Sequence, residues 1–331
     1  MSKFLVTGCA GLIGSHFTRH LLDRGHDVVG IDDLSGGYID NVDSRLDFYE
    51  RNLVDSDSLC KVFSDTKPEY VYHFAAYAAV GVSPFIRKFN YTNNVVASAN
   101  VINNCINHNV RKMVFTSSMD VYGSVCEPPY TEDLAPVPED PYGIAKYAVE
   151  MDLKQASRLF GLRYSVVRPH NVFGIYQNIW DKYRNVLGIW IRQILSGQPV
   201  TIFGDGSQVR SFSDIKYYME PLERLSLLGD GQIYNVGADT NITILEAANR
   251  LCSVARKLGY STNIVHLEPR DEVKLAYCDH SKAREQLGFI DNTDFEELVE
   301  NMFLWAASQP KREVKMIKYE VEKKLYSFWK S

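Results

Sequence analysis

Residues 4–15, FLVTGCAGLIGS, decide the fold of this chain. The apolar run at 4–7 predicts a short strand, and Gly8, Gly11 and Gly14 follow it in the spacing G-x-x-G-x-x-G. From Leu12 and Ile13 onward, apolar residues recur at helical spacing as far as residue 24. Glycines between a strand and a helix let the backbone approach a pyrophosphate, whose charge is favoured at the helix N-terminus. The segment from Gly8 to Gly14 is therefore expected to bind a dinucleotide.

A second apolar run, at 27–31, ends in Asp32 and Asp33. A carboxylate at the end of the second strand accepts hydrogen bonds from the ribose hydroxyls of adenosine and repels a 2′-phosphate. This pair favours NAD over NADP as the cofactor. The alternative is a tight structural turn followed by a surface acid.

Strand and helix patterns alternate through the first half of the chain. Strands are expected at 4–7, 27–31, 45–49, 70–74, 112–116 and 164–168, and helices at 12–24, 90–107 and 142–160. Such alternation predicts an α/β fold, a Rossmann-like doubly wound parallel sheet with helices on both faces.

Beyond residue 170 the alternation weakens and loops rich in Gly, Asn and aromatic residues appear. Short helices are expected at 186–196, 243–258, 281–287 and 294–307. We therefore predict a dinucleotide-binding domain at 1–170 and a smaller C-terminal substrate-binding lobe at 171–310, interleaved with the sheet. The basic tail at 311–331 is expected to form an amphipathic helix packed on its own fold or on a neighbouring subunit.

Composition narrows the class of protein. The 331 residues carry a net charge of -5, which lacks the basic footprint of a nucleic-acid binder. The six cysteines are scattered without a C-x-x-C pair, which favours free thiols in a reducing cytoplasm over disulfides or a metal site. The apolar run at the N-terminus is shorter than a signal-peptide core, and no run reaches the ~20 apolar residues that span a membrane.

A serine, a tyrosine and a lysine form the candidate catalytic set. Tyr142 and Lys146 stand four residues apart at the start of a predicted helix, so both lie on one face. A nearby ammonium favours phenolate, which predicts a lowered pKa for Tyr142 and a role as base. Ser118 follows the strand at 112–116, and the ends of parallel strands line the ligand crevice. Its hydroxyl is expected to bridge a sugar oxygen and the tyrosine.

These features together resemble the extended short-chain dehydrogenase/reductase superfamily and, within it, the NAD-dependent nucleotide-sugar epimerase/dehydratase family. The matching stretches run in order from TGCAGLIGS through VGIDDLS, VYHFAA, FTSSMDVYG, YGIAK, RPHNVFG, TIFGDGSQVRSF and IYNVG to CDHSKAREQLGF. The resemblance implies that Ser118, Tyr142 and Lys146 are catalytic and that NAD is the cofactor. Further positions that it implies for the cofactor are Asn52, Leu53, Ala75 and Ala76, and for the substrate Asn171, Asn185, Ile202, Phe203, Arg210 and Arg270.

The resemblance leaves three functions open. The favoured one is a 4-epimerase of a nucleotide sugar, expected to be UDP-linked glucose and galactose or their N-acetyl forms. It would act as a homodimer through transient oxidation at C4. A 4,6-dehydratase or a UDP-glucuronate decarboxylase shares that oxidation but needs further acid–base groups directly after the serine, where this chain has Met119 and Asp120. Asp120 therefore keeps this alternative open as a candidate catalytic residue. A non-catalytic NAD-binding protein is the third, although relatives of that kind usually lack the tyrosine or the lysine.

Three positions bear on the sugar site. Tyr217 stands where relatives often carry an Asp, and the segment after Arg270 is one residue shorter than the common version. Ala276 falls where a large tyrosine restricts the relatives' pocket to UDP-glucose and UDP-galactose. A small residue there predicts that 2-acetamido sugars are accepted.

Overall fold

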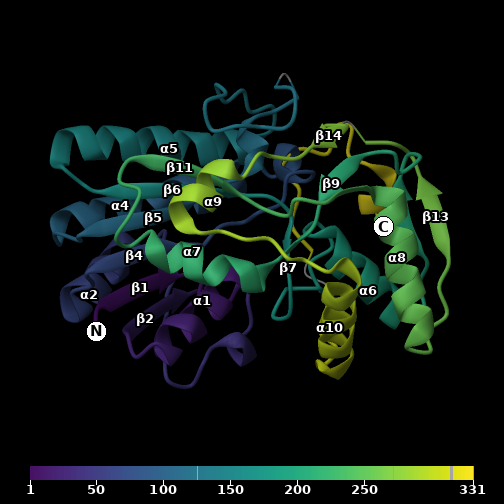
Figure 1. Cartoon of the computed structure of the whole chain (residues 1–331), viewed down its shortest axis with the longest axis horizontal. Coiled ribbons are helices and arrows are strands. Elements are labelled where there is room, and N and C mark those ends of the chain that lie inside the picture. Colours follow the sequence, from purple (N-terminus) through teal and green to yellow (C-terminus); the bar gives the residue numbers. More distant parts are fainter. Residues whose placement is uncertain (125, 271, 314–315, 331) are drawn as a thin grey trace.

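The computed structural model describes residues 1–124, 126–270, 272–313 and 316–330. Seven parallel strands form one sheet in the order β11-β6-β5-β4-β1-β2-β3 (Figure 1). Their bounds are β1 Lys3–Thr7, β2 Asp27–Asp32, β3 Asp47–Glu50, β4 Tyr70–His73, β5 Lys112–Thr116, β6 Tyr164–Pro169 and β11 Gln232–Val236. The predicted Rossmann-like α/β fold is confirmed, and β11 adds a strand from the second half of the chain.

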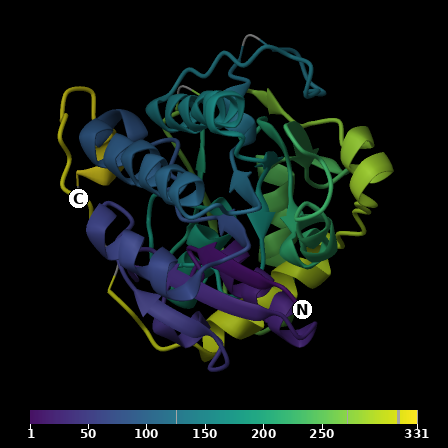
Figure 2. The ribbon, with the colours of Figure 1, turned by 90° about the vertical axis from the view of Figure 1, so that its left-hand side faces the viewer.

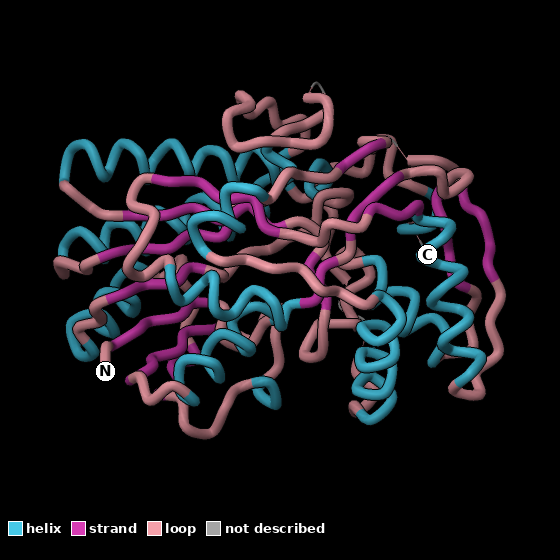
Figure 3. The backbone as a smooth tube through the Cα atoms, in the orientation of Figure 1, coloured by secondary structure: helices cyan, strands magenta, loops and turns pink. Residues whose placement is uncertain are grey.

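Helices cover both faces of this sheet (Figure 3). Leu5 lies in a core with apolar residues of α2, α4 and α5, whereas its neighbours Phe4 and Val6 lie in a core with α1, α7 and α9. This alternation of side chains between the two faces follows from the period of two in a strand. The helix bounds are α1 Leu12–Asp23, α2 Ser56–Thr66, α4 Ala97–Asn107, α5 Pro141–Phe160, α7 Met219–Arg224 and α9 Ser281–Leu287.

The helix expected at 90–107 is divided in the structure. It consists of α3 (Arg87–Tyr91), a π-helical turn at Thr92–Val96 and then α4. Within the π turn, the Asn94 side chain accepts from the Tyr77 N–H at 2.9 Å and donates to the Tyr77 carbonyl at 3.1 Å. These bonds fix the loop that follows β4 against the helix.

The C-terminal lobe has its own core, made by α6, α8 and α10 with short strands. Its helices are α6 Val186–Leu195, α8 Ile244–Lys257 and α10 Phe295–Ser308, and its strands are β7 Val172–Phe173, β8 Val200–Phe203, β9 Val209–Ser211, β10 Ser213–Asp214, β12 Asn241–Thr243, β13 Ile264–Leu267 and β14 Leu275–Ala276. Because β11, α7 and α9 pack on the large sheet, the chain crosses between the two cores several times. None of the helices in the described ranges combines the length and the apolar composition of a membrane span.

The prediction of a helical tail at 311–331 is wrong. Its described residues run as loop, apart from one 3₁₀ turn at Ser327–Trp329. After α10 the tail passes along the outside of the molecule to the segment around α3 (Figure 2), where the Glu320 N–H donates to the Phe85 carbonyl at 2.8 Å. The tail is held by contacts with residues that are distant in the sequence, such as that of Trp329 with Phe85, which the basic composition does not reveal.

Candidate active site

A cavity of about 1160 Å³ runs along the carboxyl edge of the sheet, where the C-terminal lobe faces it. It is lined by the loops that follow β1, β2, β4, β5 and β6, and by residues of the smaller lobe. Pockets for single small molecules measure ~300–1,000 Å³, so this cavity has room for a dinucleotide together with a second ligand.

The glycine loop at the first strand forms one end of the cavity. Gly8 has a φ of +73°, and a Cβ there would lie 2.7 Å from the backbone nitrogen of Ala75. A Cβ on Gly14 would clash with the Gly8 carbonyl oxygen. Gly11 caps α1 without any side-chain hydrogen bond, so the first amides of the helix stay available to an anion. All the residues predicted here line the cavity: Gly8, Gly11, Leu12, Ile13 and Gly14.

Asp32 ends β2 beside this loop. Its carboxylate accepts the N–H of Ala10 at 3.0 Å and of Leu34 at 2.8 Å. Burial raises the pKa of Asp32, and these two backbone donors oppose the rise. A carboxylate that is fixed in this way at the cavity wall fits the ribose of an adenosine.

The other predicted cofactor positions also line the cavity: Asp33, Asn52, Leu53, Ala75 and Ala76. The Asn52 amide donates to the Asp33 carboxylate at 2.8 Å, and its oxygen accepts the Val54 N–H at 2.8 Å. Asn52 therefore shapes the turn as well as facing the cavity.

The candidate catalytic side chains meet where β5 ends and α5 begins. Asp140 caps α5 by accepting the N–H of Tyr142 at 2.8 Å, so the helix starts with the tyrosine at the cavity. One turn later, Lys146 donates from Nζ to the carbonyl of Thr116 at 2.8 Å. The Ser118 hydroxyl donates to the Asp120 carboxylate at 2.8 Å. Ser118, Tyr142, Lys146 and Asp120 all line the cavity.

The expected lowering of the Tyr142 pKa does not occur in this structure. Burial raises the pKa of Tyr142, and the negative charge of Asp120 raises it further, while Ser118 acts in the opposite direction. The Lys146 ammonium is directed at Thr116, and burial lowers the pKa of Lys146 to about 7, against the pull of Glu150. Desolvation by burial is thus the largest cause of the pKa shift of both groups.

Asp120 is a second titratable group in the cavity. Burial, and then the negative charge of Asp140, raise its pKa to about 6, whereas the Ser118 hydroxyl and Arg210 lower it. A carboxyl group with this pKa exchanges protons near neutral pH, which is the property of a general acid–base group.

A buried ion pair supports the catalytic set from behind. Arg168 donates to Glu150 in a bidentate pair at 3.0 and 2.6 Å, and their side chains are 1% and 4% exposed. The Ser117 hydroxyl donates to the same carboxylate at 2.5 Å. Because Ser117 precedes Ser118 and Glu150 lies one turn after Lys146, this pair ties β5 and β6 to α5 beneath the site.

The predicted substrate residues lie at the other end of the cavity. Asn171 and Asn185 have φ of 41° and 64°, and each has a buried side-chain atom without a hydrogen-bond partner. The Arg210 guanidinium donates to the Val273 carbonyl at 2.6 Å and to Glu272 at 3.3 Å. The complete predicted set lines the cavity: Asn171, Asn185, Ile202, Phe203, Arg210, Arg270 and Ala276.

The sequence departs from the family pattern at Tyr217 and in the segment after Arg270, and these two places lie in different parts of the structure. The Tyr217 hydroxyl donates to the Asn292 carbonyl at 2.7 Å, in the chain that leads into α10. The tyrosine at 217 therefore holds the segment that leads into the C-terminal lobe. In the shortened segment after Arg270, Asp271 lies outside the described residues.

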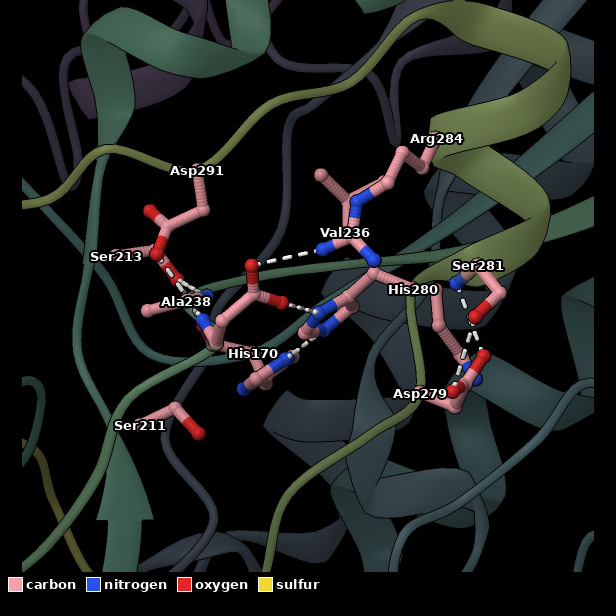
Figure 4. Close-up of polar contacts among 12 residues, drawn as sticks. His170, Ser211, Ser213, Val236, Ala238, Asp279, His280, Ser281, Arg284 and Asp291 are labelled. Carbon is pink, nitrogen blue, oxygen red and sulfur yellow. Dashed lines mark hydrogen bonds and ion pairs between the residues drawn. The ribbon is translucent and has the colours of Figure 1, made fainter.

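Two histidines that were not predicted from the sequence, His170 and His280, face each other (Figure 4). The Nε2 atoms of His170 and His280 are 2.5 Å apart, and Nδ1 of His280 is 3.2 Å from Asp239. Burial and the neighbouring imidazole lower the pKa of His170 well below its ordinary value. The hydrogen bond between the two rings ties the end of β6 to the start of α9. The sequence signal was the histidine in RPHNVFG.

Other cavity residues were also missed: Asp140, Arg184, Lys324 and Tyr326. Asp140 had a signal, because an Asp followed by Pro141 is typical of a helix start. The two tail residues had none, since nothing in the polar tail indicates which face meets the cavity.

Known proteins share this architecture. The model of the NAD dependent epimerase/dehydratase family matches residues 4–237, which include the glycine loop, the serine and the tyrosine–lysine pair. The chain belongs to this family. The predicted family is thereby confirmed, and its members use NAD, as predicted from the glycine loop and Asp32.

Relatives in the epimerase/dehydratase family match almost end to end. The UDP-glucose 4-epimerase of Mycolicibacterium smegmatis is 33% identical over 87% of this chain and 93% of its own length. The crystal structure of the Thermotoga maritima UDP-glucose 4-epimerase with UDP-glucose has a TM-score of 0.87 at 32% identity and covers 92% of this chain and 98% of that one. The Methanobrevibacter ruminantium UDP-N-acetylglucosamine 4-epimerase, in complex with UDP-N-acetylmuramic acid, has a TM-score of 0.84 at 30% identity and covers 93% and 99%.

Proposed function

We propose that this protein is an NAD-dependent 4-epimerase of a UDP-linked sugar. The observation that carries the proposal is the single cavity in which the glycine loop, the set Ser118, Tyr142 and Lys146, and the arginines of the C-terminal lobe face one another. The relatives described above, which are named as UDP-sugar 4-epimerases, support it.

In this mechanism, Tyr142 takes the proton from the 4-hydroxyl of the sugar, and Ser118 hydrogen-bonds the same oxygen. The glycine loop and Asp32 would hold NAD, which would supply the hydride acceptor and donor for C4 of the sugar. Lys146, whose Nζ lies 5.8 Å from the centroid of the Tyr142 ring, supplies positive charge that favours the phenolate form of Tyr142. Asn171, Asn185 and the arginines hold the nucleotide while the sugar turns.

The second candidate is a 4,6-dehydratase or decarboxylase, which Asp120 favours. The pKa of Asp120, about 6, suits a group that removes or returns a proton at C5 of the sugar. Two observations weigh against this role. Met119 carries no proton to donate, and Asp120 is held by the Ser118 hydroxyl at 2.8 Å.

The test is to incubate the purified enzyme with UDP-, dTDP- and GDP-linked sugars, without added NADH, and to identify the products by NMR. We expect interconversion of C4 epimers of a UDP sugar. A 4-keto-6-deoxy product would contradict the proposal. Tyr142→Phe should lose nearly all turnover and still bind NAD, and turnover within tenfold of the parent would exclude Tyr142 as the base.

We further propose that the enzyme works as a homodimer in the cytoplasm. Apolar side chains stand exposed along α5, with Met151 at 58% and Leu159 at 61%, and a second subunit would cover them. The free cysteines suit a reducing compartment. Sedimentation velocity of the parent and of Met151→Glu tests the dimer, which the charged variant should weaken.

A further inference from the structure

The tail forms a strap over one side of the cavity, which we define as residues 316–330 and call the C-terminal strap. The Glu320 carboxylate accepts the N–H groups of Lys88 and Phe89 at 2.6 and 2.8 Å, at the start of α3. The hydroxyls of Tyr319 and Tyr183 are 2.7 Å apart. These contacts dock the strap at defined positions on the rest of the chain.

The strap joins the two halves of the cavity wall. Trp329 is 3% exposed, and its ring lies 5.8 Å from Phe85 and 5.3 Å from Tyr183, measured between centroids. Phe85 belongs to the loop after β4, next to the dinucleotide end, whereas Tyr183 belongs to the loop before α6. The strap therefore contacts the sheet domain and the C-terminal lobe at once.

The strap also surrounds Arg270 with aromatic rings. The Arg270 guanidinium carbon lies 3.4 Å from the ring centroid of Phe203, 4.9 Å from Phe328, 5.1 Å from Trp329 and 5.8 Å from Tyr326. Three of these four rings come from the strap. The ring of Phe328 also packs on that of Phe203, at 4.5 Å between centroids.

Arg270 lacks a partner for part of its guanidinium. Its Nε is buried and has no hydrogen bond among the described residues. Burial lowers its pKa to about 10. Aromatic rings hold the flat faces of a guanidinium, whereas an anion binds its N–H edge. The cage thus orients Arg270 and leaves its charge for a ligand that enters the cavity.

The strap contributes to the cavity directly as well. Tyr326 and Lys324 line it together with Arg270 and Phe203. The backbone turns at Lys324, which has a φ of 62°, and the next residue, Leu325, is buried. A second cation therefore stands on the same wall as Arg270.

We propose that the C-terminal strap is part of the nucleotide-binding site. Tyr326, Phe328 and Trp329 are positioning residues that hold Arg270 for the diphosphate, and Lys324 adds a charge at the same end. This proposal rests on the proposed function, because it takes a UDP-linked ligand as the occupant of the cavity.

The test measures UDP binding to the NAD-loaded full-length enzyme by calorimetry, for the parent, Phe328→Ala, Arg270→Ala and the double variant. Loss of one cation–π contact should weaken UDP binding roughly threefold to thirtyfold in Phe328→Ala. In the Arg270→Ala background, the same change should have almost no further effect. The KM for the UDP sugar should rise while kcat changes little. Phe328→Leu keeps the bulk without the ring and should weaken UDP binding as well.

A charge-matched pair of variants tests Lys324. Lys324→Gln should weaken UDP binding, whereas Lys323→Gln, next to it and outside the cavity lining, should not. Unchanged or tighter UDP binding in Phe328→Ala would overturn the proposal, since tighter binding means that the strap obstructs the site. A parent that binds no UDP would refute the proposed function itself, and the strap's role with it. Thermal unfolding of each variant verifies that the fold is retained.

Discussion

Replacing Glu150 by Gln tests how packing beneath the site controls its chemistry. The substitution keeps the shape of the side chain and removes the charge that pairs with Arg168. Both side chains are almost fully buried, at 4% and 1% exposed, and the closest contact of the pair is 2.6 Å. Removing one partner of such a pair strands the other charge in a low dielectric and costs about 3–5 kcal/mol. We expect the free energy of unfolding to fall by that amount.

The assay is denaturation in urea, followed by circular dichroism and by tryptophan fluorescence. Glu300→Gln, on the exposed side of α10, is the matched control and should change the free energy of unfolding by less than ~0.5 kcal/mol. The double variant Glu150→Gln with Arg168→Met should recover part of the loss, because it removes the stranded cation. If Glu150→Gln destabilises the protein by no more than ~1 kcal/mol, the size of an ordinary substitution, the pair does not carry the energy assigned to it.

The same variant has a consequence for turnover. Burial lowers the pKa of Lys146, and the charge of Glu150 raises it; the resulting pKa of Lys146 is about 7. Without that charge, the pKa of Lys146 falls, and the ammonium is lost at a lower pH. Lys146 supports the phenolate only while it is protonated, so the alkaline decline of kcat should move to lower pH. A pH profile that coincides with the parent's would contradict this coupling.

Three further predictions follow from the cavity lining. The parent should bind NAD at least ~10-fold more tightly than NADP, a difference of about 1.4 kcal/mol, because Asp32 repels the 2′-phosphate. Fluorescence titration measures the two affinities, and equal affinities would rule this prediction out. Asp120→Asn should keep epimerase activity. Because the charge of Asp120 raises the pKa of Tyr142, its removal should move the acid limb of the kcat/KM profile to lower pH. A variant that oxidises the sugar and then stalls would instead indicate a dehydratase. Ala276→Tyr should reduce kcat/KM for UDP-GlcNAc far more than for UDP-glucose, because buried Ala276 leaves space that a ring would fill; equal losses for the two sugars would refute this.

The sequence alone determined the sheet domain and the chemical groups of the site. Three glycines between a strand and a helix, and a tyrosine four residues before a lysine, are local patterns, and their geometry follows from neighbouring residues. The expected position of Ser118 at the end of a parallel strand followed from the same reasoning, because such ends share one edge of the sheet. All the residues predicted for the cofactor and the substrate line the one cavity.

Only the tertiary structure decided how those groups are tuned and what closes the site. The pKa of Tyr142 rises because the fold buries it near Asp120, and spacing along the helix gives no measure of that burial. The strap took a course that its basic composition does not encode, because Trp329 is buried by Phe85 and Tyr183, which come from distant parts of the chain. Burial and long-range packing depend on every element at once, whereas a local pattern reports only on its own turn of backbone.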